Sequence, residues 1–262
     1  MRLLSTFAAV VPIASVFLSP TSAYAEDGPR ISGPFTHENL SVYFVHGASA
    51  QGPVPLTLSE ALDKQMVEVV ETGSVNELKI RNKGSEPIFI QSGDLVKGGR
   101  QDRVVTTSFV LPPKSGSVPL ASFCVEHGRW SQRGKEVAER FSSSSEALPS
   151  RKAKLAMKAP LPVAQAAPAD LPANSRNHQQ ALNHDETGKR QQMIWNEVAS
   201  TQDKLSGGLK QSVNAAESST SLQLSLENEK LRAARSDYIE ALEDKAEAGD
   251  IIGYVFAVNG QI

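Results

Sequence analysis

The sequence predicts an α+β fold, with a β-rich N-terminal half that contains one short helix and a C-terminal half with two amphipathic helices and a final strand. Three observations predict this order. Apolar and polar residues alternate over several short stretches between residues 40 and 125, as in half-buried strands. Long stretches with helical spacing of apolar residues follow residue 190. An apolar stretch from Ile251 then leads into an Asn-Gly pair, which favours a tight hairpin turn.

The first 25 residues have the features of a cleavable secretory signal. Arg2 precedes an apolar run from Leu3 to Leu18, and a small-residue triplet ends at Ala25, before acidic residues. The run contains Pro12 and is shorter than the roughly 20 residues that cross a bilayer. We therefore expect an exported, soluble chain in the periplasm or outside the cell, with no stable membrane insertion after cleavage. A retained membrane anchor is the alternative.

Charge and cysteine content argue against several classes of function. The 262 residues include 27 Lys+Arg and 29 Asp+Glu, without a dense basic run, so nucleic acid is not an expected partner. Cys124 is the sole cysteine, which excludes an intrachain disulfide. The five histidines are scattered, and HExxH and CxxC are absent. We expect neither a metal nor a cofactor.

The N-terminal half is expected to consist of short elements. Residues 28–34 are rich in turn formers. The TLSE sequence that begins at Thr57 is a capping box, which predicts a short helix through about Gln65. Strands are expected at residues 40–45, 66–71, 77–81, 87–91, 104–111 and 118–125.

The last of these strands has two different faces. Phe123 and Val125 share one face, while Cys124 and Glu126 share the other. Cys124 and His127 are three residues apart, so strand geometry directs them to opposite sides and argues against a nucleophile–base pair. We expect a buried, unreactive thiol, and we expect Trp130 to lie in the core.

Composition changes near residue 142. Residues 142–183 are rich in Ser, Ala and Pro and have few large apolar side chains, so they bury too little surface to offset their ordering entropy. We expect a mobile segment, with a helical turn around residues 152–157. The first long helix then carries Ile194, Val198 and Leu205 on one stripe and ends at Gly207, and the second spans about residues 222–248.

Two motifs carry a resemblance to a known family. The first is GDLVKGGRQDR, from Gly93 to Arg103, and the second is CVEHGRW, from Cys124 to Trp130. With the segments PLTLSEALDKQMVEVVETGSVNELKIRN, QQMIWNEV and IGYVFAVNG, they resemble the ARPP-1 family (ARG and rhodanese-phosphatase-superfamily-associated protein domain) in the expected order. The resemblance implies one domain over residues 26–262, interrupted by the Ser/Ala/Pro-rich segment. It implies no reaction.

The sequence departs from the family pattern at three places. Asp102 replaces a usual asparagine, and His127 occupies a variable position. The family pattern also continues beyond the Asn-Gly turn into an acidic-aromatic segment and a helix. The resemblance therefore implies a C-terminally short relative.

Four polar residues of these motifs are candidates for ligand binding: Gln101, Arg103, Glu126 and Arg129. If residues 101–103 are extended, Gln101 and Arg103 point the same way and could converge on an anion or a carboxylate. The structural alternative is a turn in which Arg103 pairs with Glu126 and joins two strands.

A glycine-rich loop precedes these residues. Gly93, Gly98 and Gly99 allow positive φ angles or a close approach to a ligand or a neighbouring strand. The loop is not a Walker phosphate loop, because the Lys-Ser/Thr pair is replaced by Gly99 and Arg100. The two motifs form one site only if this loop and the Cys124 strand are neighbours in the fold.

Three function classes remain open. The first is a non-catalytic module that binds an anionic or nucleotide-derived small ligand through the four candidate residues. The second is a hydrolase in which Glu126 is the acid or base and Arg103 or Arg129 is an electrostatic clamp. The third is a structural or protein-interaction domain, with Leu224 and Leu231 on a helix surface for an unknown protein partner.

Overall fold

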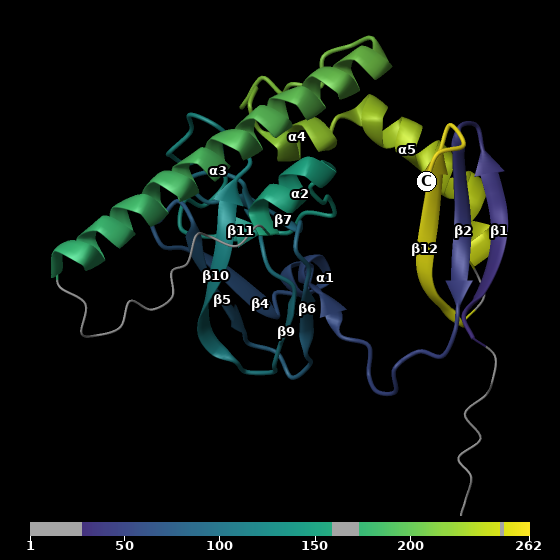
Figure 1. The fold of residues 1–262 in the computed structure, drawn as a ribbon, viewed down its shortest axis with the longest axis horizontal. Helices are drawn as coiled ribbons and strands as arrows, with labels where there is room; N and C mark the ends of the chain where they lie inside the picture. The colour runs from purple at the N-terminus through teal and green to yellow at the C-terminus, as the bar shows by residue number, and fades with distance from the viewer. Residues whose placement is uncertain (1–27, 159–172, 247–248) are drawn as a thin grey trace, which may run out of the picture. The chain divides into compact units, whose positions relative to one another are not determined.

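A computed structural model of the chain describes residues 28–158, 173–246 and 249–262 (Figure 1). For residues 173–184 it describes the backbone only. The chain divides into two compact units. The larger unit is Gln51–Glu243, and the smaller unit combines the segment before it, up to Ala50, with Asp244–Ile262. The predicted signal and residues 159–172 of the predicted mobile segment lie outside the described residues.

The smaller unit is an antiparallel three-stranded sheet in the order β1-β2-β12. Its strands are β1 (Arg30–His37), β2 (Leu40–His46) and β12 (Ile251–Val258), coloured purple to yellow in Figure 1. Residues 28–34 are rich in turn formers, but most of them lie in β1. Its pairing with β2 shifts register between Ser32 and Phe35, and such a bulge on an edge strand accommodates Gly33 and Pro34.

The predicted Asn-Gly turn after β12 is confirmed. Asn259 and Gly260 have φ angles of 52° and 75°, as a tight hairpin turn with two left-handed residues requires. The Val258 N–H donates to the Gln261 carbonyl at 2.8 Å, which closes the turn.

The larger unit contains two sheets. A six-stranded sheet has the order β11-β7-β8-β10-β5-β4, and a three-stranded sheet has the order β3-β6-β9. The strands are β3 (Leu56–Thr57), β4 (Val67–Glu71), β5 (Glu77–Asn82), β6 (Ile88–Ile90), β7 (Leu95–Gly98), β8 (Arg103–Val105), β9 (Phe109–Leu111), β10 (Gly116–Cys124) and β11 (Phe141–Ser142).

One expected strand is divided between these two sheets. Residues 104–111 alternate as a single strand would, but β8 pairs with β7 and β10, whereas β9 pairs with β6. The exposed residues Thr107 and Ser108 lie where the chain passes from one sheet to the other. All three residues of β8 are buried, whereas β9 buries only Leu111. The alternation of residue types along the sequence carries no information about the pairing partner.

Two predicted helices are present, and the second is much longer than expected. The capping box of Thr57 and Glu60 starts α1 (Leu58–Asp63). In α3 (Ala173–Leu209), Ile194 and Val198 are buried as expected, but the helix begins well before the expected start at Arg190 and continues past Gly207. Within the segment expected to be mobile, the structure describes α2 (Arg151–Lys158) and the start of α3.

The prediction of one long helix over about residues 222–248 is wrong. The structure has α4 (Leu222–Leu226), α5 (Glu229–Leu242) and a 3₁₀ turn, η1 (Glu243–Ala246). The Asn228 side chain accepts hydrogen bonds from the backbone N–H groups of Lys230 and Leu231, so it caps a new helix between α4 and α5.

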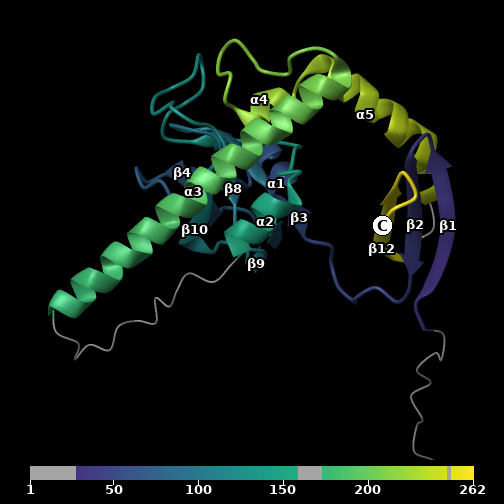
Figure 2. The ribbon, with the colours of Figure 1, turned by 45° about the horizontal axis from the view of Figure 1, so that its top comes forward.

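Two apolar cores hold the larger unit together. One lies within the strands and α1, around residues such as Ile80 and Ile88. In the other, α3 packs across the six-stranded sheet (Figure 2). Ile194 belongs to the same cluster as Phe123 and Val125. Phe123 and Val125, which were expected to share one face, lie in the same core.

Candidate functional site

The pairing of β8 with β10 brings the two sequence motifs together. Arg103 and Cys124 are direct partners in the antiparallel register, so the expected contact between the glycine-rich loop and the Cys124 strand is confirmed. The Arg129 guanidinium completes the junction: Nη2 donates to the Gly98 carbonyl at 3.1 Å, and Nη1 donates to the Gly99 carbonyl at 3.0 Å.

The glycines of the loop serve this close packing. Gly98 and Gly99 have φ angles of 111° and 54°, in the region that favours glycine. A Cβ atom on Gly99 would lie 2.3 Å from the ring of Phe141 in β11. The neighbour that requires a glycine at position 99 is therefore a strand of the same sheet rather than a ligand.

Glu126 is fully buried and its carboxylate has several donors. Arg129 binds it through Nε and Nη2, both at 2.7 Å, and Arg133 Nη1 donates at 3.3 Å. The backbone N–H of Asp102 donates to the same carboxylate at 3.0 Å. Such a bidentate, buried pair fixes the turn that follows β10.

Asp102 is a second buried carboxylate beside Glu126. It accepts hydrogen bonds from Arg133 Nη1 and Nη2 at 2.8 and 2.9 Å, from Ser221 Oγ at 2.6 Å and from the Gly98 N–H at 2.9 Å. We call Asp102, Glu126, Arg129 and Arg133 the carboxylate–arginine cluster. Its two carboxylates and two guanidinium groups balance in charge, as buried ions must.

Sequence reasoning missed two members of this cluster. Asp102 was noted only as a departure from the family pattern, and Arg133 lies three residues after the second motif. Arg133 is 7% exposed, and its guanidinium also binds Glu136 Oε1 at 2.8 Å. The sequence signal for the cluster was Asp102 itself, which lies between the candidates Gln101 and Arg103. A buried Asp requires a hydrogen-bond donor as its partner.

The candidate residues do not converge as expected. Arg103 donates to the Glu71 carboxylate at 3.2 Å and to the Val75 carbonyl at 2.6 Å, so it pairs with Glu71 and not with Glu126. Gln101 instead donates to the Glu126 backbone carbonyl at 3.1 Å. Gln101, Arg103, Glu126 and Arg129 therefore lie at one junction but each has partners within the protein.

The thiol of Cys124 is buried beside Arg103. Burial raises the pKa of Cys124 to about 11, because desolvation outweighs the opposite effect of the Arg103 charge. The thiol is therefore protonated at neutral pH.

The exposed His127 ring packs edge-on against Trp195, with 4.4 Å between ring centroids. The expectation that Trp130 lies in the core is wrong, because Trp130 is 42% exposed. Cζ of Arg103 lies over the Trp130 ring, 5.5 Å from the ring centroid.

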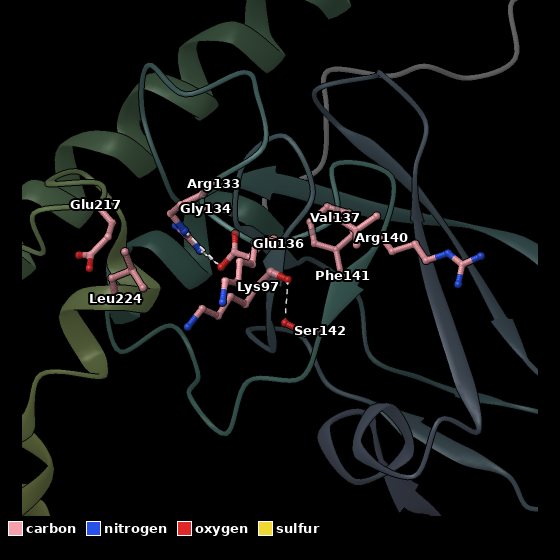
Figure 3. Close-up of a pocket in the computed structure, with 12 residues that line it drawn as sticks. Lys97, Arg133, Gly134, Glu136, Val137, Arg140, Phe141, Ser142, Glu217 and Leu224 are labelled. Carbon is pink, nitrogen blue, oxygen red and sulfur yellow. Dashed lines mark hydrogen bonds and ion pairs between the residues drawn. The ribbon is translucent and has the colours of Figure 1, made fainter.

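A pocket of about 590 Å³ adjoins the carboxylate–arginine cluster (Figure 3). Arg133 belongs to both, and Figure 3 shows its guanidinium meeting Glu136. The lining includes the cationic residues Lys97, Lys135 and Arg140, and the acidic residues Glu136 and Glu217.

The polar groups of this pocket differ in how they are engaged. Lys97 Nζ binds Glu227 at 2.6 Å, and Arg140 Nε lies 3.3 Å from a Glu68 carboxylate oxygen. Figure 3 shows the Arg140 head pointing away from the other labelled side chains. Lys135 is exposed and has no ion pair among the described residues. Oε2 of Glu136 is buried and has no hydrogen-bond donor in the described part of the chain.

The described residues contain neither a cluster of metal ligands nor a membrane-spanning helix. In these ranges, no group of three or more His, Cys, Asp and Glu side chains is arranged to hold a metal ion. No helix in the described part of the chain combines the length and apolar character needed to cross a membrane.

The fold and the junction define an α+β protein in which two motifs are joined by a buried carboxylate–arginine cluster. Residues 28–262 match the family described as ARG and Rhodanese-Phosphatase-superfamily-associated Protein domain, ARPP-1. The chain belongs to this family, and the resemblance found in the two motifs is confirmed. No curated protein and no solved structure matches the chain.

The burial of Glu126 predicts a dependence of stability on pH. Burial alone would raise the pKa of Glu126, but the hydrogen bonds from Arg129 and from the Asp102 N–H hold it below 4.5. A lowered native pKa stabilises the fold above the unfolded pKa, and this contribution is lost as the pH falls through the native pKa. We expect the stability difference between wild type and Glu126→Gln to shrink on acidification.

Urea unfolding at about pH 7 and about pH 3 measures this difference. Glu77→Gln is the control, because Glu77 is exposed on β5. Its difference from wild type should stay near zero at both pH values. A Glu126→Gln difference that is constant with pH would contradict the prediction.

Proposed function

We propose that the larger unit is a non-catalytic module that binds a small anionic, nucleotide-derived ligand in the pocket beside Arg133. The observation that carries this proposal is the charge of the lining. Four cationic side chains line the pocket, against two carboxylates. Three of these cations are ion-paired, and Lys135 has no ion pair among the described residues. A concave site with a cation that has no partner favours a phosphate or a carboxylate.

The ligand is expected to contact the pocket rather than the four residues selected from the sequence. Gln101, Glu126 and Arg129 use their polar groups within the protein, and Arg103 does so through its two terminal nitrogens. Glu126 is fully buried, and its lowered pKa favours a permanently charged group over an acid or base. These contacts support a structural role for the junction, which holds Arg133 in place behind the pocket.

Glu136 indicates the second feature of the ligand. Its Oε1 atom binds Arg133 at 2.8 Å, whereas its buried Oε2 atom has no donor among the described residues. A buried acceptor without a donor is costly, so a ligand hydroxyl or amine is a suitable partner. A cationic wall beside a carboxylate acceptor suits a ribose or sugar that carries a phosphate.

We further propose that the protein acts outside the cytoplasm, in the periplasm or the extracellular space. The support is the arrangement of Arg2, the apolar run and the small residues up to Ala25, which suits signal cleavage. The near balance of 27 basic and 29 acidic residues supports a small ligand in preference to nucleic acid.

Calorimetric titration with ADP-ribose, ADP, ribose 5-phosphate and inorganic phosphate tests the ligand class. We expect Lys135→Glu to weaken the binding of the phosphorylated ligands by about tenfold, since it reverses a charge in the pocket lining. Lys79→Glu is the matched control, because Lys79 is exposed on β5 and is not among the lining residues. Its affinity should equal that of wild type.

Glu136→Ala gives the second comparison. It should weaken ADP-ribose and ribose 5-phosphate more than inorganic phosphate, which has no ribose hydroxyl groups. The proposal fails if folded wild-type protein binds none of the four ligands, or if Lys79→Glu and Lys135→Glu weaken binding equally.

A further inference from the structure

A serine, a histidine and an aspartate form a hydrogen-bonded chain in the smaller unit. Ser32 Oγ lies 2.7 Å from His46 Nε2, and His46 Nδ1 lies 2.8 Å from Asp250 Oδ1. Ser32 and Asp250 are far apart in the sequence. Both reach His46 because β2, which carries His46, is the central strand between β1 and β12. These are the distances that a nucleophile, a base and an orienting carboxylate require.

The chemistry of the three groups fixes the direction of the hydrogen bonds. An ionised carboxylate only accepts, so His46 Nδ1 must carry the proton that it shares with Asp250. In neutral His46, Nε2 is then the acceptor for the Ser32 hydroxyl. The hydrogen bond from His46 also lowers the pKa of Asp250, which keeps the carboxylate ionised near neutral pH.

The sheet holds each member of the chain in position. His46 is 5% exposed and pairs with Arg30 in the β1–β2 register. Arg30 lies two residues before Ser32 on β1, so His46 and Ser32 are on the same face of the sheet. The backbone carbonyl of Asp250 accepts the Gly47 N–H at 2.9 Å, and its second carboxylate oxygen binds Arg30 at 2.9 Å. The register shift directly after Ser32 is the kind of bulge that redirects a side chain beside a site.

We propose that Ser32, His46 and Asp250 form a second site, in which Ser32 is the nucleophile that hydrolyses esters with an apolar acyl group. Ser32 is half-buried, so part of the residue is exposed to solvent beside His46. The site lies wholly in the smaller unit, and it does not depend on the ligand proposed for the pocket of the larger unit.

An exposed aromatic surface beside Ser32 indicates the acyl group. Ser32 pairs with Phe44, which pairs with Tyr254 on the other side, so all three share one face of the sheet. Phe44 contacts Phe35 and Tyr254, with centroid distances of 5.1 and 5.7 Å. Tyr254 and Phe256 are 57% and 55% exposed, an unusual state for adjacent aromatic side chains. This surface suits a medium-length alkyl or an aryl chain.

The reaction proceeds in two balanced steps. Ser32 Oγ attacks the ester carbonyl carbon while its proton passes to His46 Nε2, and the ester bond breaks as the alkoxide takes this proton and leaves as an alcohol. Water then attacks the acyl-Ser32 carbonyl and gives a proton to His46 Nε2. The acyl–oxygen bond breaks, Ser32 recovers the proton, and the carboxylic acid is released. Asp250 acts as a positioning residue, because it contacts His46 and not the reacting atoms.

The test uses the full chain with two readouts. Purified protein is assayed with p-nitrophenyl acetate, butyrate and octanoate, and it is labelled with a fluorophosphonate whose site is located by peptide mass spectrometry. We expect label on Ser32 and faster turnover of the longer esters. Ser32→Ala should lose the label and reduce turnover by about 10³-fold or more.

Ser41→Ala is the matched control, since Ser41 lies on the opposite face of the same sheet, where it bonds Thr36 at 2.8 Å. It should keep the label and the turnover of wild type. Asp250→Asn should reduce kcat by about 10³-fold or more with little change in KM, and Asp250→Glu should restore part of this loss. A structural role alone would not separate kcat from KM.

Thermal melting checks that each variant is folded, and Ser32→Cys provides a second nucleophile if Ser32→Ala does not fold. A labelled thiol at position 32 supports the proposal. The proposal is overturned if folded wild-type protein takes no label at Ser32, or if the ester turnover persists unchanged in folded Ser32→Ala or Asp250→Asn.

Discussion

Replacement of Asp102 by alanine is expected to lower the free energy of unfolding by about 3–5 kcal/mol. Asp102 is fully buried and binds both terminal nitrogens of Arg133, at 2.8 and 2.9 Å. Without it, the Arg133 guanidinium keeps Glu136 but loses its bidentate partner, and the Gly98 N–H and the Ser221 hydroxyl lose their acceptor. The main cost is the loss of these partners for buried groups, because the attraction within a buried pair is largely offset by desolvation.

Urea unfolding of wild type and Asp102→Ala measures this cost. Asp203→Ala is the control, because Asp203 is exposed on α3, and its effect should lie within about 0.5 kcal/mol. Asp102→Asn should fall between wild type and Asp102→Ala, since an amide oxygen still accepts from Arg133 but carries no charge. An Asp102→Ala variant as stable as Asp203→Ala would show that the cluster does not stabilise the fold.

Replacement of Ile194 by alanine is expected to cost about 2–5 kcal/mol of stability. Ile194 is fully buried where α3 packs on the six-stranded sheet, in the core that contains Phe123 and Val125. Its removal takes away apolar contact and leaves a cavity that the sheet and the helix can close only in part.

Met193→Ala is a matched control for this substitution. Met193 is the adjacent residue on the same helix but is 41% exposed, so its loss should cost much less. Equal unfolding midpoints for the two variants would mean that α3 does not pack on the sheet as described. Thermal or urea unfolding of the full chain gives both values under the same conditions.

Together, these two substitutions separate the polar and apolar parts of the larger unit. Asp102 acts through a single charged cluster at the junction of the motifs, whereas Ile194 acts through close packing of a helix on a sheet. The two residues lie in different types of contact, so a double variant should show nearly additive losses if the contacts are independent.

Local features of the fold were determined by the sequence itself. The capping box at Thr57 predicted the start of α1, and the Asn259–Gly260 pair predicted the turn after β12. The alternation around Phe123 and Val125 predicted that these two side chains share one face, and both lie in the same core. Each of these features depends on residues a few positions apart, where backbone geometry links sequence spacing directly to orientation.

Pairings between distant segments were decided only by the tertiary structure. The sequence placed Arg103 near Glu126, but the register of β8 and β10 directs Arg103 toward Glu71 and leaves Glu126 for Arg129. Likewise, Asn228 divides one expected helix because its cap competes with continuation of the helix.

The site proposed in the smaller unit shows the same limit of sequence reasoning most clearly. Ser32 and His46 are 14 residues apart, and His46 and Asp250 are 204 residues apart, so no motif joins them. Their alignment depends on the strand order β1-β2-β12 and on the bulge after Ser32. The sequence by itself determined the family, the fold class and the motifs, whose signals are local. Strand order and register then decided which side chains meet, because long-range pairing leaves no periodic pattern in the chain.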